Sequence, residues 1–169
     1  APMTTSKVLP ALPLLAPALV AGTLATPAAA ATVSVTIPRI NVAEYHRPYV
    51  VGWLEPVAGG AARTVFVWYD VKKAGREPGT KWLADLRTWW RKGGRSMQLP
   101  ADGLSGATRA PGTYQIPLPA NLAPGQYVLK VEAARETGGR ELVSLPLTVP
   151  VKKGGSAAGT TELGAITIR

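Results

Sequence analysis

The sequence predicts a single domain of mainly β structure, and three observations lead to this expectation. The chain has 169 residues, its 18 glycines and 16 prolines imply frequent turns, and short runs of β-branched and aromatic residues recur between those turns. Because 46% of the residues are hydrophobic and only 17% are charged, the chain as a whole is not of the disordered class.

The first thirty residues are expected to be a secretory signal peptide. A single charge, Lys7, precedes an apolar stretch from Val8 to Leu24, and the segment ends in small residues around Ala30. A basic start, an apolar middle and a small-residue cleavage site are the parts of such a signal. A membrane anchor is the alternative, but prolines interrupt the apolar stretch and no basic cluster follows it. We therefore expect a periplasmic mature protein, cleaved near Ala30, that does not span the membrane.

The remainder, residues 31–169, is expected to form one domain of seven short strands. In the first, Val33, Val35 and Ile37 alternate with polar residues and share one face. The next two are dense in valine and aromatic residues, which is typical of strands buried on both faces. The expected strands lie at 32–40, 49–54, 64–69, 114–118, 127–133, 143–149 and 162–168. Seven such strands with regular turns indicate an immunoglobulin-like β-sandwich, and residues 152–160 are expected to be a flexible linker.

One inserted amphipathic helix is expected between the third and fourth strands. Thr80 can cap a helix that runs to about Lys92, where two glycines would end it. Its apolar residues recur at helical spacing and would face the sandwich. These residues are Trp82, Leu83, Leu86, Trp89 and Trp90. A long Gly- and Ser-rich loop, 93–113, follows, and such loops in compact domains are usually functional. Helix and loop together occupy about 79–112.

Composition excludes several classes of site. The chain has no cysteine and one histidine, His46, which excludes disulfides, thiolate nucleophiles, cysteine zinc sites and multi-histidine metal sites within one chain. No Ser/His/Asp arrangement points to an independent enzyme. The net charge is +9, and residues 72–109 hold nine basic residues against three acids. Because the protein is expected to be exported, nucleic acid is an unsuitable ligand for these basic residues. They form either a solvated surface or a binding site for an anion.

A motif with chemical meaning lies in the long loop, where residues 102–108 read DGLSGAT. This run resembles the target motif of the periplasmic flavin transferase, D-G-x-S/T-G-A-T, at all six specified positions. The resemblance implies that FMN is attached to Thr108 through a phosphoester bond. It also implies a surrounding recognition frame, formed by Asp102, Gly103, Ser105, Gly106 and Ala107.

The physical requirements of such a modification agree with the sequence. The acceptor segment must be exposed and pliable, which Gly103 favours, and the transferase must activate the Thr108 hydroxyl. Arg109 could stabilise the phosphodiester. The flavin ring would stack on Trp89 or Trp90. Adjacent helix positions point about 100° apart, so one of the two can be available to the flavin. The alternative is that both pack in the core.

His46 has three possible roles from the sequence. It could contact the flavin, it could ligate a haem or metal together with a partner, or it could cap a turn before Arg47 and Pro48. The residues around it leave these alternatives open.

A second resemblance covers nearly the whole mature chain. Residues 43–50, 67–70, 81–87 and 132–136 resemble a bacterial family of predicted periplasmic proteins of unknown function (DUF type). Its members often occur beside PepSY-type membrane proteins and the flavin transferase. The resemblance implies an immunoglobulin-like fold and a role in electron transfer outside the cytoplasm.

Two functions are therefore expected from the sequence. The first is a periplasmic flavoprotein with covalent FMN on Thr108, which carries electrons from a PepSY-type membrane reductase and is not itself an enzyme. The alternative is a non-catalytic immunoglobulin-like module that docks a membrane or metal-related partner. The Thr108 hydroxyl distinguishes them, because only the first requires it.

Overall fold

The computed structural model describes residues 31–71 and 78–169, together with isolated positions 2, 3, 10, 11, 13, 17 and 22. Apart from those positions, the expected signal peptide lies outside the described residues. The same holds for the basic residues Lys72, Lys73 and Arg76.

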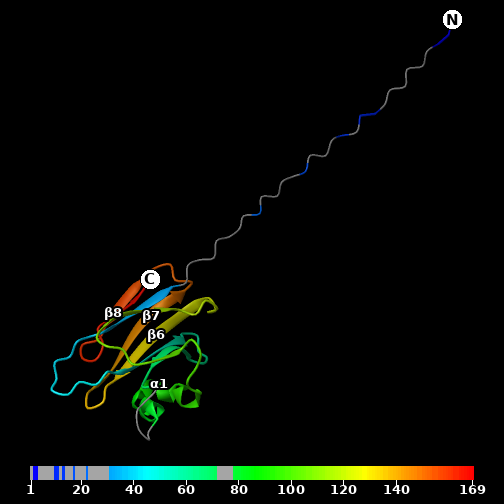
Figure 1. Ribbon diagram of the computed structural model, residues 1–169. Helices are drawn as coiled ribbons and strands as arrows, with labels where there is room; N and C mark the ends of the chain where they lie inside the picture. The colour runs from blue at the N-terminus through cyan, green and yellow to red at the C-terminus, as the bar shows by residue number, and fades with distance from the viewer. Residues whose placement is uncertain are drawn as a thin grey trace.

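Two β-sheets form the described domain (Figure 1). The four-stranded sheet has the order β5-β1-β9-β8, with every neighbouring pair antiparallel. Its strands are β1 (Thr32–Ile37), β5 (Gly112–Pro117), β8 (Gly155–Ala158) and β9 (Ala165–Ile168). The first and last segments of the domain therefore lie side by side in one sheet.

The five-stranded sheet has the order β4-β3-β2-β6-β7 and is antiparallel except at the β3–β4 edge. Its strands are β2 (Tyr49–Pro56), β3 (Arg63–Trp68), β4 (Ser105–Gly106), β6 (Gly125–Ala134) and β7 (Arg140–Val149). The expectation of a mainly β domain is confirmed.

The main hydrophobic core lies between the two sheets. Val33 and Val35 of β1 and Ile166 of β9 belong to the same buried cluster as Leu54 of β2 and Leu129 of β6, and all five side chains are fully buried. The strict alternation in β1 places its valines on this inner face, as the sequence pattern predicts.

A second core covers the outer face of β2 and β3. Val51, Trp53 and Val67 pack there against Leu86 and Trp89 from the segment after Pro78. This layer explains why β2 and β3 are apolar on both faces, because one face meets the other sheet and the opposite face meets the helical segment.

The expectation of one helix from Thr80 to Lys92 is wrong. The segment forms a 3₁₀ helix, η1 (Gly79–Asp85), and a single-turn α-helix, α1 (Arg87–Arg91), followed by the short η2 (Gly94–Ser96). Leu86 separates the first two with ψ at 70°, and no side chain caps η1. The Thr80 cap is therefore also wrong.

The start of α1 is fixed by a carboxylate from another element. Glu132 of β6 is fully buried, and its Oε2 and Oε1 accept from the backbone N–H groups of Thr88 and Trp89 at 3.1 and 3.0 Å. Arg140 Nη1 donates to the same Oε2 at 2.6 Å. This anchor satisfies the free N–H groups at the start of a helical turn, so the helix restarts at this point instead of continuing.

Two expectations near the C-terminus are also corrected. The linker 152–160 is not a flexible connection throughout, because β8 forms within it and pairs with β9. The last strand begins at Ala165 rather than 162, since the Glu141 carboxylate accepts from the backbone N–H groups of 160–163 and holds them in a turn.

Candidate functional site

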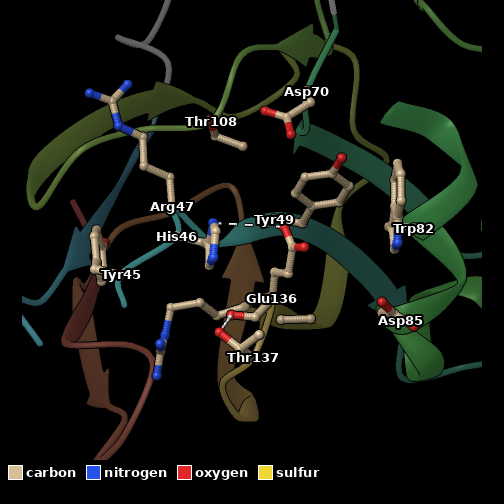
Figure 2. Close-up of a pocket in the computed structure, with 12 residues that line it drawn as sticks. Tyr45, His46, Arg47, Tyr49, Asp70, Trp82, Asp85, Thr108, Glu136 and Thr137 are labelled. Carbon is tan, nitrogen blue, oxygen red and sulfur yellow. Dashed lines mark hydrogen bonds and ion pairs between the residues drawn. The ribbon is translucent and has the colours of Figure 1, made fainter. Parts of the chain in front are cut away.

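A cavity of about 500 Å³ lies at one end of the five-stranded sheet (Figure 2). It is placed where β2 begins and where β3 and β6 end, and η1 closes one side. Its lining residues come from five separate segments of the chain. They are Tyr45, His46, Arg47, Tyr49, Asp70, Trp82, Asp85, Thr108, Ala134, Arg135, Glu136 and Thr137.

Thr108, the expected FMN acceptor, lines this cavity and is half-buried. Figure 2 shows Thr108 and Asp70 along one edge of the cavity. Tyr45 and Trp82 lie on opposite sides of the cavity. His46 lines the same cavity. The fold therefore brings together two of the sequence-predicted residues that are 62 positions apart in the numbering.

The rest of the motif does not form the pliable loop that was expected. Val67 N–H donates to the Leu104 carbonyl at 2.9 Å, and Tyr69 N–H donates to the Gly106 carbonyl at 3.0 Å. These bonds attach β4 to the edge of β3. The motif is thus held against the sheet immediately before Thr108, and a transferase would meet a folded segment.

Three motif residues have structural roles of their own. Gly103 adopts φ 74°, a left-handed conformation that glycine tolerates best. Ser105 Oγ accepts from Ala101 N–H at 2.9 Å. A Cβ on Gly106 would lie 3.2 Å from Arg109 Nη2. By contrast, Asp102 and Ala107 are exposed.

Arg109 does not line the Thr108 cavity. Its guanidinium lies over Trp68, with Cζ 5.0 Å from the ring centroid, and Nη1 donates to the Ala107 carbonyl at 2.7 Å. It lines a smaller neighbouring cavity together with Gly106. Arg109 therefore shapes the backbone around Thr108 in this arrangement.

The tryptophans of the helical segment are distributed differently from the expectation. Trp89 is 1% exposed, and its Nε1 donates to Thr64 Oγ1 at 2.9 Å, so it belongs to the core. Trp90 is half-buried against the same cluster. Trp82 lines the cavity instead. The interruption at Leu86 breaks the single helical stripe on which the sequence argument depended.

His46 sits between two carboxylates. Its Nε2 lies 2.8 Å from Glu44 Oε1, and its Nδ1 lies 3.8 Å from Glu136 Oε2, the pair joined by a dashed line in Figure 2. Both ring nitrogens are therefore close to acceptors. These two contacts position the imidazole at the cavity wall.

Tyr49 forms part of the cavity wall as a neutral phenol. Its hydroxyl donates to the Gly79 carbonyl at 2.9 Å. Burial and the neighbouring Asp70 carboxylate raise its pKa to about 12. Tyr49 therefore contributes aromatic surface without charge at neutral pH.

The charges around the cavity differ from the expected cationic setting. Asp70, Asp85 and Glu136 line it, against Arg47 and Arg135. None of the described basic residues from 81 to 95 is among its lining residues. Within the described ranges, Arg47 and Arg135 are therefore the arginines that line the cavity with Thr108, whereas Arg109 lies outside it.

Arg135 also lines the cavity, whereas the sequence leaves open whether its charge belongs to a polar network or to a partner-docking rim. Its Nε and Nη2 donate to the Glu162 carboxylate at 2.9 and 3.1 Å, and the two side chains are only 6% and 5% exposed. The hydrogen bond with Glu162 raises the pKa of Arg135. Arg135 Nη1 and the Tyr45 hydroxyl are buried, and neither has a hydrogen-bond partner among the residues that the structure describes.

The comparisons with known proteins agree with the periplasmic expectation. A family model described as "Predicted periplasmic protein (DUF2271)" matches residues 30–165. No curated protein and no solved structure matches the chain. None of the helices among the described residues has the length and apolar character needed to cross a membrane. The chain belongs to the DUF2271 family of predicted periplasmic proteins.

Proposed function

We propose that this protein is a periplasmic flavoprotein that carries FMN covalently on Thr108 and transfers electrons as a carrier rather than as an independent enzyme. We also propose that its two sheets form an immunoglobulin-like sandwich, a scaffold on which loops at one end build the site.

One observation carries the proposal most directly. The last residue of the flavin-transferase target motif, Thr108, lines a cavity of about 500 Å³ whose walls include Tyr45, Tyr49 and Trp82. Small-molecule sites typically have volumes of about 300–1,000 Å³ and aromatic linings. A flat isoalloxazine ring packs favourably against such side chains. The acceptor hydroxyl and a surface suited to the ring therefore occur together.

The residues of the chain would bind and orient the group. Bound FMN supplies reversible one- and two-electron chemistry, while the protein supplies position and electrostatics. Tyr49 and Trp82 offer aromatic surface, and Arg47 is the lining cation outside a buried ion pair. His46 is a further lining residue, held between the Glu44 and Glu136 carboxylates.

The modification itself requires a partner, the periplasmic flavin transferase. A bond forms between Thr108 Oγ1 and the phosphorus of an FMN donor with a phosphoanhydride. The donor's anhydride P–O bond breaks, the other phosphate of the anhydride departs as the leaving group, and the hydroxyl proton passes to a base of the transferase. The product gains the mass of FMN less one water. A PepSY-type membrane reductase remains the proposed source of electrons.

The experiment compares the exported protein with two variants after co-expression with a flavin transferase. The wild type should be yellow and carry one FMN, whereas Thr108→Val should be colourless and unmodified. Thr148→Val is the matched control, because Thr148 is an exposed threonine on β7 outside the motif. Intact mass and the visible spectrum give the readout. An unmodified wild type, under conditions that load a known acceptor, would refute the proposal.

The competing proposal is a non-catalytic binding module that docks a membrane or metal-related partner. One observation favours it: Gly103, Ser105 and Gly106 each have a packing or turn role, so the motif pattern has a structural reason independent of a transferase. For such a module, Thr108→Val should leave partner binding unchanged. The same variant thus separates the two proposals.

A further inference from the structure

Two buried hydrogen-bond donors of cavity-lining residues have no partner within residues 31–71 and 78–169. They are the Tyr45 hydroxyl and Arg135 Nη1. The Arg135 side chain is 6% exposed, so water does not readily replace the missing acceptor. Buried polar groups are nearly always hydrogen-bonded, because an unsatisfied donor destabilises the folded protein. Two such atoms in neighbouring residues indicate that an acceptor belongs here.

The Arg135 guanidinium is fixed in place by the surrounding fold. Its other two groups, Nε and Nη2, donate to the Glu162 carboxylate, which also accepts from Gly139 N–H at 3.0 Å. The guanidinium carbon lies 5.9 Å from the centroid of the Tyr45 ring. Nη1 is therefore the donor left over after Glu162 has been satisfied, and it lies close to Tyr45.

The charge balance indicates what kind of acceptor fits. Glu162 already neutralises Arg135, and the Glu136 carboxylate follows Arg135 in the chain and lines the same cavity. A carboxylate or phosphate beside Arg135 would therefore gain little attraction from its guanidinium. A neutral acceptor such as a carbonyl oxygen requires no net positive charge, and the Tyr45 hydroxyl and Arg135 Nη1 can donate to it. The site thus favours a carbonyl on an uncharged ring.

We propose that Tyr45 and Arg135 receive the carbonyl-bearing edge of the flavin ring, with Tyr45 turning its hydroxyl into the cavity. This inference rests on the proposed function in taking a flavin as the ligand. Thr108 lies along a different edge of the cavity from Tyr45 in Figure 2. The two ends of the ligand are thereby assigned: the phosphate to Thr108 and the ring carbonyls to Tyr45 and Arg135.

Removal of the Tyr45 hydroxyl should have opposite effects on the free and the loaded protein. In the free protein, Tyr45→Phe deletes an unsatisfied buried group and should raise the unfolding temperature or leave it unchanged. With ligand present, the same change deletes a hydrogen bond. Tyr127→Phe is the matched control, because its hydroxyl donates to the Ala123 carbonyl at 2.6 Å and lies outside the cavity. That control should lower the unfolding temperature and leave ligand binding unchanged.

The first test titrates riboflavin into the unmodified full chain and follows quenching of flavin fluorescence. Riboflavin has the ring but no phosphate, so its binding does not depend on the covalent bond. We expect Tyr45→Phe to weaken binding about fivefold, the loss equivalent to one ordinary hydrogen bond. Arg135→Lys keeps the charge beside Glu162 but removes Nη1, and should also weaken binding. Equal affinities for wild type and Tyr45→Phe, or no binding by the wild type, would overturn the inference.

The second test uses protein loaded with FMN through Thr108. Infrared difference spectra should show a flavin carbonyl stretch at higher wavenumber in Tyr45→Phe than in the wild type, because a lost hydrogen bond stiffens the C=O bond. Unchanged carbonyl bands in Tyr45→Phe and Arg135→Lys would contradict the assignment. The two proposals can fail separately. If riboflavin binds and Tyr45→Phe weakens that binding, but Thr108 is never modified, then the covalent carrier is refuted and the ring site at Tyr45 and Arg135 stands.

Discussion

At the scale of single residues, the site depends on which side chains face the cavity and which face the core. Trp82 and Trp89 are seven positions apart and would share a face of one continuous helix. The structure separates them, because Trp89 is 1% exposed while Trp82 lines the cavity. Sequence periodicity cannot distinguish the two when the helix is interrupted between them.

This difference predicts opposite outcomes for two tryptophan variants. Trp89→Ala should lower the free energy of unfolding by about 3–5 kcal/mol, because it empties a buried site and leaves Thr64 Oγ1 without its donor. Trp82→Ala should cost about 1 kcal/mol, but should weaken quenching of bound flavin. Urea denaturation and flavin fluorescence measure the two effects. Strong quenching in Trp82→Ala would contradict its place beside the ring.

Asp102 allows a test of the recognition frame without a large structural change. Its side chain is exposed, in contrast to Ser105 and Gly106, which have packing partners. Asp102→Ala should abolish flavin attachment and change the free energy of unfolding by no more than an exposed substitution usually does, about 0.5 kcal/mol. Intact mass after co-expression with the transferase gives the result. Full loading of this variant would exclude Asp102 from the frame.

At the scale of elements, carboxylates distant in sequence decide where helices and strands begin. Glu132 lies 44 residues from Thr88, yet it fixes the first turn of α1. Glu141 similarly holds residues 160–163 and shortens the last strand. Neither effect can be read from local propensity, because in each case the deciding interaction is tertiary.

Glu132→Ala should be strongly destabilising. The substitution removes the acceptor of Thr88 and Trp89 N–H groups and leaves Arg140 without its buried partner. Each backbone N–H left without its acceptor costs about 1–3 kcal/mol, whereas Arg140 is 40% exposed and can be hydrated. Thermal unfolding followed by near-ultraviolet circular dichroism would report it, since α1 carries Trp89 and Trp90. A loss below about 1 kcal/mol would show that α1 does not depend on this anchor.

Glu141 predicts a specific loss of stability in acid. Burial acts to raise its pKa, but hydrogen bonds from the backbone of Thr160, Leu163 and Thr161 outweigh it and lower the pKa from 4.5 to about 2. Because the folded-state pKa is below the unfolded value, its contribution is complete above about pH 4.5 and is lost as the pH falls toward 2. After allowance for partial exposure, the contribution is about 2 kcal/mol. In Glu141→Gln, chemical unfolding should show a shallower decline between pH 5 and pH 2. If the free energy of unfolding declines as steeply in Glu141→Gln as in the wild type, then other titrating groups cause the loss of stability in acid.

At the scale of the whole molecule, the sequence predicts the strands far better than the site. The alternation of Val33, Val35 and Ile37, and the continuous apolar runs of β2 and β3, correspond to observed strands with one or two buried faces. By contrast, β8 has the composition Gly-Ser-Ala-Ala, which carries no period, and becomes a strand only because β9 offers an edge. A pattern-based reading cannot supply such a partner.

The cavity is a further property of the whole fold. Its walls combine residues before β2, after β3, in η1, after β4 and after β6, and no local motif links these segments. The sequence pointed to Thr108 and His46 through a motif and through the rarity of histidine. Tyr45, Trp82 and Arg135 come together at the cavity only when the strand ends converge. The helical spacing predicts that Trp82 faces the core, and the flavin-transferase motif includes neither Tyr45 nor Arg135.

The central claim, that Thr108 carries the flavin in a periplasmic carrier, is tested most directly by peptide mapping. Trypsin cleavage after Arg95 and Arg109 releases the peptide 96–109, in which Thr108 is the one threonine. In exported protein co-expressed with a flavin transferase, this peptide should gain the mass of FMN less water, with fragmentation placing the gain on Thr108. An unmodified peptide, or a flavin found on Ser96 or Ser105, would contradict the account.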